Sequence, residues 1–563
     1  MYKILLCLLF ICSCSTTKKF FKKEKVNKKK KVSKVVHNYG PTNSGNTVFK
    51  DITDDVGLNG VYSVRNYIVD INGDGREDLV ILPDYYSTPE FYLKTKEGKF
   101  LKSKNVFFED SVKASFLIFD DFDKDGRLDV LVAVHNQRTS LTLRPISIYS
   151  IKQLRDNFVF RKNEKFQFKD NLPSTSISTF DYDYDGFLDF YVGTWFDLKQ
   201  NGKLIPDKFY TFKDNKITDI SGILQGEYKE DGKLFPNASP TYGVSHCDVN
   251  GDGLTDILTS SSAGHKNKLW VLEKTKTGLL YFNRAQESGF SDDKEGRMIL
   301  RGGGNSSYAI CSDYNNDGFM DIAQGEVSHY YDPEIRDRSS ILTGEGLRKY
   351  SSFIRSEYIS DKGLANWTQS DQRASWFDYN NDGVIDLLIE NSGHPPLTRT
   401  ILFKQLNDHE LVEVSSEAGV DIVNPVGSVV YDHNDDGKLD LLVSRSDLRD
   451  GKISKRIFVF ENRSPNTFNF IKLVLSGVNS NKNGVGAKVF VRDTYGNEQS
   501  RWAQNSYGPF PSGHSKTIHF GLGSARVEEV IVHWPLIENG QVKKSVYKKP
   551  FLRENSTNIL IEK

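Results

Sequence analysis

The chain has 563 residues, of which 38% are hydrophobic and 12% are aromatic, and it contains 44 glycines. This length exceeds one ordinary core, so we expect several domains or one large closed architecture, and the aromatic and glycine content argues against a helical bundle. The formal net charge is zero, but residues 1–40 hold 11 Lys and one Glu, and removing these from the two totals of 74 leaves 63 basic and 73 acidic residues. The body of the chain therefore carries a net charge of −10, which argues against nucleic acid as its partner.

The N-terminal residues have the pattern of an export signal. Lys3 precedes the apolar run Ile4 to Ile11, which is too short to span a bilayer. The run ends in Ile11-Cys12-Ser13-Cys14, which resembles a bacterial lipobox. We therefore expect residues 1–13 to be a lipoprotein signal peptide and Cys14 to be the lipid-modified first residue of the mature protein. The alternative is a plain secretory signal that is cut nearby.

Residues 14–45 are rich in lysine and contain almost nothing apolar to bury. Such a composition predicts a disordered tether between the lipid and the folded body. Attraction to anionic head groups is a second possible role for the same lysines. We accordingly expect a membrane-anchored lipoprotein that faces the periplasm or the cell exterior.

A nine-residue acidic pattern recurs seven times and organises residues 46–462. The copies begin at positions 70, 121, 181, 248, 313, 378 and 432, so their spacings are 51, 60, 67, 65, 65 and 54 residues. Each copy lies between two short apolar runs, such as residues 427–431 and 440–444, and a third and fourth run follow, such as 456–461 and 411–420. Four strands in each of seven units predict an all-β fold, a seven-bladed β-propeller.

The phase of the repeat predicts how the ring closes. A run of the fourth type, residues 48–53, precedes the first acidic loop, whereas the seventh unit stops after its third run at Asn462. We therefore expect residues 48–53 to form the outer strand of the last blade, which removes an exposed sheet edge.

The composition of the acidic loops predicts calcium binding. Positions 1, 3, 5 and 9 hold Asp or Asn and position 6 is always Gly, whereas position 7 varies in type, as expected where only its backbone carbonyl is used. The Asp at position 9 is expected to offer two oxygens. Oxygen donors suit Ca²⁺, and the absence of His and Cys from these positions disfavours zinc. We expect up to seven structural calcium ions; the alternative is a set of metal-free polar turns.

The predicted ligands, at positions 1, 3, 5, 7 and 9 of the seven loops, are Asp70, Asn72, Asp74, Arg76, Asp78, Asp121, Asp123, Asp125, Arg127, Asp129, Asp181, Asp183, Asp185, Phe187, Asp189, Asp248, Asn250, Asp252, Leu254, Asp256, Asp313, Asn315, Asp317, Phe319, Asp321, Asp378, Asn380, Asp382, Val384, Asp386, Asp432, Asn434, Asp436, Lys438 and Asp440.

Cys247 and Cys311 are the two cysteines of the body, and they precede their acidic loops at different offsets. This difference predicts that the two side chains point differently along their strands. We therefore expect two small buried residues rather than a disulfide or a nucleophile.

The chain ends in a second region, residues 466–563. Alternation in residues 470–475 and 488–491, with glycine-rich turns between such runs, predicts a compact β domain.

These motifs resemble two known families. The acidic repeats are similar to the FG-GAP or VCBS-type repeats of integrin-α-like propellers. Residues 480–487, 519–523 and 532–535 resemble the ASPIC/UnbV domain that follows such propellers in the cartilage acidic protein family. The resemblance implies an extracellular protein that binds a matrix or a surface. Residues 507–513 depart from the expected polar turn by two prolines, so no ligand-binding role is assigned to them.

The expected function is binding of an extracellular glycan or protein. Long connections at residues 195–205, 224–241, 291–307 and 328–371 are expected to gather on the face opposite the acidic loops, where Trp195 and Trp367 can stack on sugar rings. Unselected surface loops are the alternative. No catalytic constellation is recognisable, so we expect no enzyme. A polysaccharide lyase or hydrolase with its site on that face, and an envelope scaffold, remain the competing hypotheses.

Overall fold

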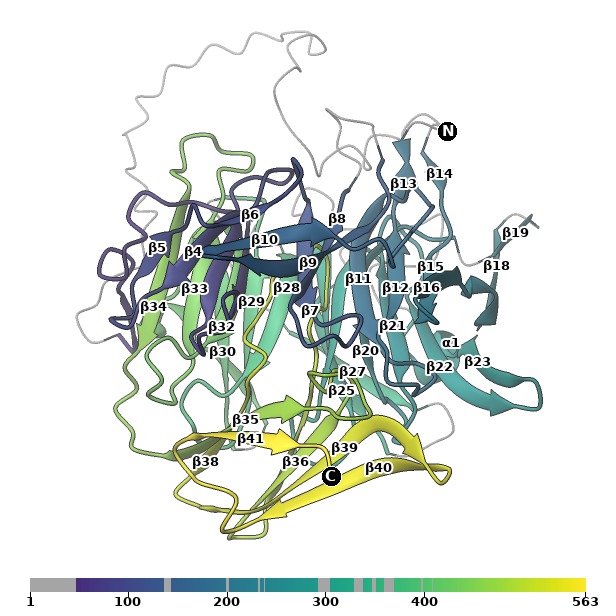
Figure 1. Cartoon of the computed structure of the whole chain (residues 1–563). Helices are drawn as coiled ribbons and strands as arrows, with labels where there is room; N and C mark the ends of the chain where they lie inside the picture. The colour runs from purple at the N-terminus through teal and green to yellow at the C-terminus, as the bar shows by residue number, and fades with distance from the viewer. Residues whose placement is uncertain are drawn as a thin grey trace, which may run out of the picture.

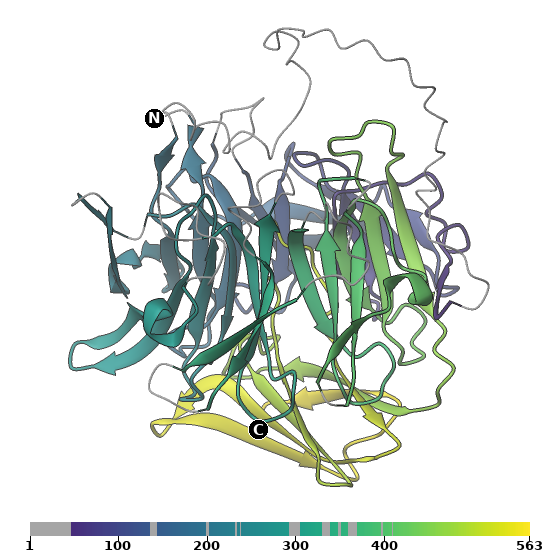
Figure 2. The ribbon, with the colours of Figure 1, turned by 180° about the vertical axis from the view of Figure 1, so that it is seen from behind.

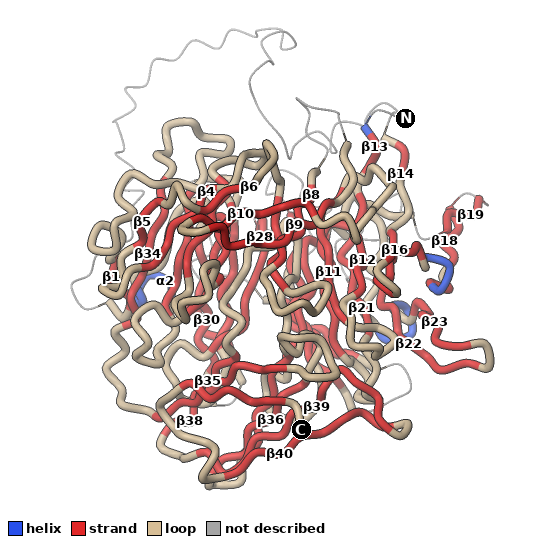
Figure 3. The backbone as a smooth tube through the Cα atoms, viewed as in Figure 1, coloured by secondary structure: helices blue, strands red, loops and turns tan. Residues whose placement is uncertain are grey.

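The computed structural model describes residues 47–135, 143–198, 202–230, 233–236, 238–291, 304–328, 338–346, 351–358, 369–395, 398–407 and 409–563. Strands dominate these ranges (Figures 1 and 3), and the helices are the short elements η3 (Ser221–Ile223), α1 (Ala285–Ser288) and α2 (Ser415–Ala418). No helix in the described ranges is long and apolar enough to cross a membrane. Cys14, the predicted signal peptide and residues 14–45 of the predicted tether lie outside these ranges.

Seven four-stranded antiparallel meanders make up the larger part of the protein, and each acidic loop joins the first two strands of one meander. The first three consist of β2 (Arg65–Val69), β3 (Asp78–Leu82), β4 (Glu90–Lys94) and β5 (Phe100–Lys102); of β7 (Phe116–Asp120), β8 (Asp129–Ala133), β9 (Ser147–Leu154) and β10 (Asn157–Lys162), with β6 (Val106–Phe108) added in parallel; and of β11 (Ser174–Phe180), β12 (Asp189–Thr194), β15 (Lys208–Lys213) and β16 (Lys216–Asp219).

The last four meanders follow the same order. They consist of β20 (Thr241–Cys247), β21 (Asp256–Ser261), β22 (Lys268–Thr275) and β23 (Gly278–Asn283), with β17 (Leu224–Gln225) added in parallel; of β24 (Ser306–Ser312), β25 (Asp321–Ser328), β26 (Ser340–Gly344) and β27 (Phe353–Glu357); of β28 (Gln369–Phe377), β29 (Asp386–Asn391), β30 (Thr400–Gln405) and β31 (Leu411–Glu413); and of β32 (Pro425–Tyr431), β33 (Asp440–Arg445), β34 (Arg456–Asn462) and β1 (Phe49–Asp51).

The meanders pack side by side in a β-propeller-like fold. First strands contact first strands: β11 lies against β20, β20 against β24, β24 against β28, and β2 against β32. The Tyr67 hydroxyl accepts the Leu117 N–H at 2.9 Å and so links β2 to β7. The N-terminal strand β1 pairs with β34, with Phe49 opposite Asn462, which is the pairing that the sequence predicts.

Both faces of these strands are covered, because each sheet packs between two others. All five residues of β2, β3, β7 and β8 are buried. One apolar cluster joins Phe116 and Ile118 of the second meander to Ile177 and Phe190 of the third. Burial on both sides explains why strands such as β3, β7 and β8 are short, nearly continuous apolar runs.

The long connections contain more regular structure than the sequence predicts. Residues 328–371, expected to be one connection, include β26 and β27, which are the third and fourth strands of the fifth meander. Hairpins β13–β14 (Phe196–Asp197, Lys203–Leu204) and β18–β19 (Glu227–Glu230, Lys233–Pro236) lie in two others. Such short strands inside long polar insertions give too little alternation to recognise. Trp367 lies outside the described residues.

Cys247 and Cys311 form a disulfide between β20 and β24, so the expectation of two unpaired cysteines is wrong. β20 and β24 belong to neighbouring sheets, and one face of the first sheet packs against the opposite face of the next. Side chains that meet across such a stack come from positions of opposite alternation. The one-residue difference in offset from the acidic loops, which suggested that the cysteines point apart, is therefore what allows them to meet.

Breaking this disulfide is expected to lower the melting temperature by several degrees. The two cysteines are 64 residues apart in sequence, and closing a loop of that length constrains the unfolded chain by about 4 kcal/mol in the chain-entropy estimate. Thermal unfolding of Cys247→Ser, with and without reductant, measures the effect. Reductant should destabilise the wild type and leave the double variant Cys247→Ser/Cys311→Ser unchanged; an equal shift in both would place the effect elsewhere.

The C-terminal domain lies beneath the acidic-loop side of the meanders (Figures 1 and 2). Its two sheets have the orders β38-β35-β41 and β37-β36-β39-β40, and Trp534 is fully buried between them. The strands are β35 (Asn469–Ser476), β36 (Lys488–Asp493), β37 (Glu498–Trp502), β38 (Ile518–Gly523), β39 (Val527–Glu538), β40 (Gln541–Lys548) and β41 (Thr557–Ile561).

One connection of this domain, residues 504–516, runs up between the first strands of the meanders, and we call it the axial segment (Figure 1). The Gly508 N–H donates to Val244 of β20 at 3.0 Å, the Phe510 N–H donates to Thr175 of β11 at 2.7 Å, and Gly513 exchanges two hydrogen bonds with β2. Further contacts are made with β7 through Phe116, with β24 through Tyr308, with β28 through Arg373 and with β32 through Val430. The axial segment therefore touches the first strands of all seven meanders.

The two prolines in this segment have a structural explanation. Pro509 and Pro511 are buried and have no N–H that needs a partner, whereas the Phe510 N–H between them is hydrogen-bonded. Arg373 donates to the carbonyl oxygens of Pro509 and Phe510 at 3.1 and 2.9 Å. The two prolines make residues 507–513 unlike a polar surface turn. They suit a segment whose backbone lies in the interior of the protein.

Candidate metal centres

The seven acidic loops share one backbone conformation. Position 6 is a glycine with positive φ in every loop, as predicted. Position 4 also has positive φ in every loop, although it is glycine only twice. The position 4 residues are Gly73, Lys124, Tyr184, Gly251, Asn316, Asn381 and Asp435. Two left-handed residues two positions apart curl the chain and bring its side chains to one centre.

Backbone amides hold the acidic side chains in place. In each loop the carboxylate at position 1 accepts the N–H of the glycine at position 6, as Asp121 does from Gly126 at 2.8 Å. The carboxylate at position 5 accepts the N–H of position 7, as Asp125 does from Arg127 at 2.9 Å. The loops are thus preorganised around their centres.

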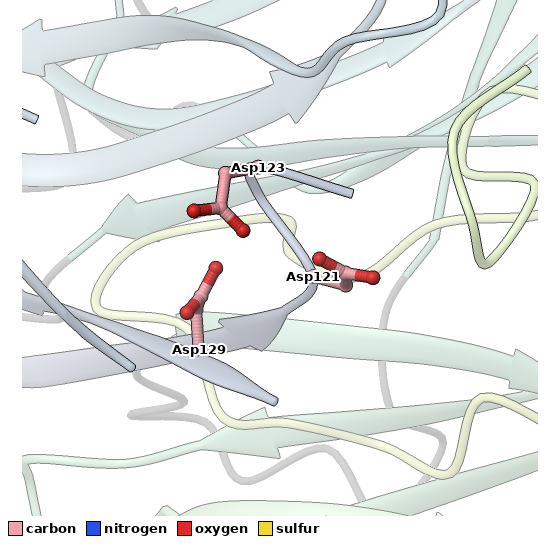
Figure 4. Close-up of side chains that lie close together, drawn as sticks. All are labelled: Asp121, Asp123 and Asp129. Carbon is pink, nitrogen blue, oxygen red and sulfur yellow. The ribbon is translucent and has the colours of Figure 1, made fainter. Parts of the chain in front are cut away.

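Two loops bring three carboxylates together. In the second loop, oxygens of Asp121, Asp123 and Asp129 lie within 4.8 Å of one another and their side chains converge (Figure 4). Asp181, Asp183 and Asp189 form the same arrangement in the third loop. Both loops have Asp at position 3, where the other five have Asn. The second and third loops are therefore the most anionic candidates for a cation site.

Unpartnered oxygens in these loops fit a bound cation. One oxygen each of Asp123, Asp129, Asp183 and Asp189 is buried without a hydrogen-bond partner in the described part of the chain. The same holds for one oxygen of Asp378 and of Asp432, at position 1 of the sixth and seventh loops. Buried carboxylate oxygens rarely go unpaired, because leaving water without a partner is costly. A hard cation such as Ca²⁺ would supply the missing partner.

Electrostatics lead to the same conclusion. Burial raises the pKa of Asp129 to about 8, and the nearby charge of Asp123 adds to the shift. Burial also raises the pKa of Asp121 to about 6. In the third loop, burial and mutual repulsion hold the pKa of Asp181 and Asp189 well above the ordinary value. Without a cation Asp121 and Asp129 take up protons in the neutral range, and a bound cation would restore the carboxylates.

The aspartate at position 9, which the sequence predicts to offer two oxygens to the ion, also accepts hydrogen bonds from the backbone. In all seven loops one of its oxygens accepts the N–H of position 2. In five loops the other oxygen accepts an N–H at the third strand of the meander, as Asp78 does from Lys94 at 2.8 Å. This aspartate therefore ties the loop to two strands, and only Asp129 and Asp189 keep an oxygen without a partner among the described residues.

The C-terminal domain also docks against the acidic loops. Lys472 Nζ lies 2.7 Å from Asp432 and 3.0 Å from Asp435, and Asn483 donates to Asp120 at 2.6 Å. Phe470 closes over Gly437, where an added Cβ would lie 1.9 Å from its ring. The predicted metal loops are therefore a docking surface as well, which their sequence does not indicate.

Aromatic and histidine residues near the loops have mainly packing roles. His246 is fully buried, with Nδ1 2.7 Å from the Ser178 hydroxyl, and Trp376 stacks on Tyr314 at 5.8 Å. Trp195 is half-buried, 5.3 Å from the Tyr242 ring.

Comparisons with known proteins identify the repeats and the last domain. An FG-GAP-like repeat matches residues 70–132 and 248–323, and the family described as ASPIC and UnbV matches residues 477–548. A T-cell immunomodulatory protein homolog of Plasmodium falciparum is 25% identical over 287 residues, covering 48% of this chain and 36% of that protein. Its counterpart in Plasmodium yoelii yoelii is 24% identical over 163 residues, covering 27% and 20%. The chain thus spans about a third or less of these relatives.

Two solved structures show distant similarity. BBS1N, in a crystal structure of its complex with ARL6DN, is 11% identical with a TM-score of 0.38, covering 75% of this chain and 98% of that one. The Pseudomonas aeruginosa periplasmic gluconolactonase is 10% identical with a TM-score of 0.33, covering 72% and 97%.

Proposed function

We propose that this chain, which combines FG-GAP-like repeats with a C-terminal ASPIC and UnbV domain, is an exported calcium-binding protein whose meanders close into a seven-bladed propeller. Calcium is structural in this proposal and holds the turn between the first two strands of each blade. The observation that carries it is the set of buried, unpartnered carboxylate oxygens at Asp123, Asp129, Asp183 and Asp189.

Closure of the ring is supported at both ends of the chain. The strand β1 pairs with β34, and β2 of the first meander lies against β32 of the last. The axial segment contacts the first strands of all seven meanders, which a straight row of sheets would not allow.

Export and lipid anchoring at Cys14 are part of the proposal. The Cys247–Cys311 disulfide supports export, because disulfides persist mainly in oxidising compartments. The pattern Ile11-Cys12-Ser13-Cys14 supports the anchor, and the lysines that follow support a tether at the membrane surface.

The proposed activity is binding of an extracellular glycan or protein, without turnover and without nucleic acid as a partner. The C-terminal domain covers the acidic-loop side, so the ligand is assigned to the opposite face, where Trp195 and Tyr242 lie at the start of the β12–β15 connection and of β20. No step of catalysis is assigned to the chain.

Binding of the mature protein to immobilised glycans and matrix proteins tests this function. Retention in calcium, its loss in chelator, and no chemical change in the retained ligand are expected. Trp195→Ala should weaken binding about tenfold if the indole stacks on the ligand, whereas the buried, inter-sheet Trp270→Phe should not. Turnover of a polysaccharide that one substitution on this face abolishes would contradict the proposal.

A further inference from the structure

A chamber of about 340 Å³ separates the acidic-loop side of the meanders from the C-terminal domain. Its upper wall comes from β24, β28 and the first and seventh acidic loops, and its lower wall comes from residues 501–505 and 514–519. Cavities of roughly 300–1,000 Å³ between domains are common sites for small ligands. Neither the calcium loops nor the opposite face accounts for this chamber.

The chamber wall holds five basic and three acidic side chains, and two of its cations are paired with acids behind the wall. The basic residues of its wall are Arg76, Lys94, Lys472, Arg501 and Lys516, against the acidic residues Glu77, Asp432 and Asp435. Asp432 is also a proposed calcium ligand, so calcium binding would make the wall more positive still. Arg76 pairs with Asp74, Lys516 with Asp120, and Lys472 with Asp432 and Asp435. Lys94 and Arg501 are therefore the wall's cations without an ion pair among the described residues.

Arg501 is the guanidinium of this wall that forms no ion pair among the described residues. Its guanidinium donates to two neutral acceptors, the Ser500 carbonyl at 2.9 Å and the Gln499 side chain at 3.1 Å. The acids whose charge acts on it are Asp313 and Asp378, each at position 1 of an acidic loop. Calcium in those loops would take up that charge and leave Arg501 available for another anion.

Arg501 also keeps surface that a ligand can reach. It lies deep between the two parts of the protein, and burial lowers its pKa to about 10. Its side chain nevertheless remains partly exposed while it lines the chamber. A guanidinium in this setting suits a carboxylate, which it can bind through two parallel hydrogen bonds.

The rest of the wall fits a ring that carries hydroxyl groups. Trp376 and Tyr507 are half-buried in the wall, where each ring has one face stacked on a protein ring, Tyr314 and His514 respectively. Gln504 contributes a side-chain amide. A few polar groups placed among aromatic faces are typical of a site for a polar organic ligand.

We propose that this chamber binds a small sugar acid, with the ligand carboxylate on Arg501 and its ring beside Trp376 and Tyr507. This site is separate from the proposed ligand-binding face. It rests on the proposed function in one respect, because calcium in the fifth and sixth loops would neutralise the acids beside Arg501. Either domain alone lacks one wall, so the docked chain is required.

Calorimetric titration of the full mature chain with glucuronate, galacturonate and glucose tests the proposal. Calcium uptake is measured first on the same sample, so a failure of calcium binding and a failure of sugar-acid binding are read separately. In calcium, at least one of the two uronates should bind and quench tryptophan fluorescence, and glucose should bind at least tenfold more weakly, because it lacks the carboxylate.

Arg501→Gln should weaken uronate binding tenfold or more, since a charge-assisted hydrogen bond is lost. The matched control, Arg526→Gln, removes an exposed arginine of the same domain and should leave binding unchanged. Absence of uronate binding to the calcium-loaded wild type overturns the proposal without the need for any variant. Equal binding of glucose, or of inorganic sulfate, likewise overturns it, as does an Arg501→Gln variant that folds and binds normally.

Discussion

Removing calcium with excess chelator is expected to lower the melting temperature by about 10 °C or more, and calcium should restore it. A ligand that binds only the folded state stabilises it by about 2.7 kcal/mol per site at 100 times its dissociation constant, so several sites together have a large effect. Differential scanning calorimetry in chelator, calcium and magnesium measures this. Magnesium should restore little, because it prefers a smaller site and keeps its waters.

Matched substitutions localise the effect to the loops. Asp129→Asn removes a carboxylate from the second loop and should reduce the calcium-dependent shift in melting temperature. Asp156→Asn makes the same chemical change at an exposed turn and should reduce nothing. A full calcium response in Asp129→Asn would show that this loop is not a calcium site.

The same carboxylates predict how calcium stabilisation varies with pH. Burial raises the pKa of Asp78 and Asp378 to about 7 and of Asp129 and Asp321 to about 8, from an ordinary value of 3.8. Between pH 4 and 8 the folded, calcium-free protein therefore holds more protons than the unfolded chain, so its stability should fall as pH rises. Calcium competes with those protons, and the gap between calcium-loaded and calcium-free melting temperatures should widen from pH 5 to pH 8.

Replacing residues 508–513 with an equally long Gly-Ser segment is expected to destabilise the whole molecule and to release the C-terminal domain. The replacement removes the Phe510 ring that Arg65 lies against, and it removes the prolines that fix the backbone carbonyls that accept from Arg373. Two buried arginines are then left without well-placed partners. Thermal unfolding and limited proteolysis near residue 465 report the two effects. An expected loss of several kcal/mol follows from the number of buried hydrogen bonds involved.

The control for this change is a Gly-Ser replacement of residues 494–497, the turn between β36 and β37, where Tyr495 is 69% exposed. That variant should unfold like the wild type. If the two replacements had the same effect on unfolding and proteolysis, the axial segment would not contribute to holding the two domains together.

The repeated loops made much of the fold predictable. Seven copies of one acidic pattern located the first two strands of every meander, and the unassigned strand at residues 48–53 indicated the pairing of β1 with β34. These inferences depend only on local sequence and on counting. The positive φ at position 4 was less visible, because Lys124 and Tyr184 adopt it without being glycine.

Features that depend on packing between sheets could not be deduced in the same way. Cys247 and Cys311 meet because neighbouring sheets stack opposite faces, which alternation within one strand does not reveal. The axial segment is positioned by first strands from all seven meanders, which are far from it in sequence. In the sequence alone, Pro509 and Pro511 therefore resemble a disrupted turn. The second role of Asp78 and its equivalents, as links to the third strand, likewise appears only when the strands are in place.

Counting the calcium ions retained per chain after desalting, by elemental analysis on protein of known concentration, tests the central claim most directly. The account predicts up to seven ions, with at least the second and third loops occupied and with Asp129→Asn and Asp189→Asn each removing one. A chain that retains no calcium at micromolar free concentration would contradict it.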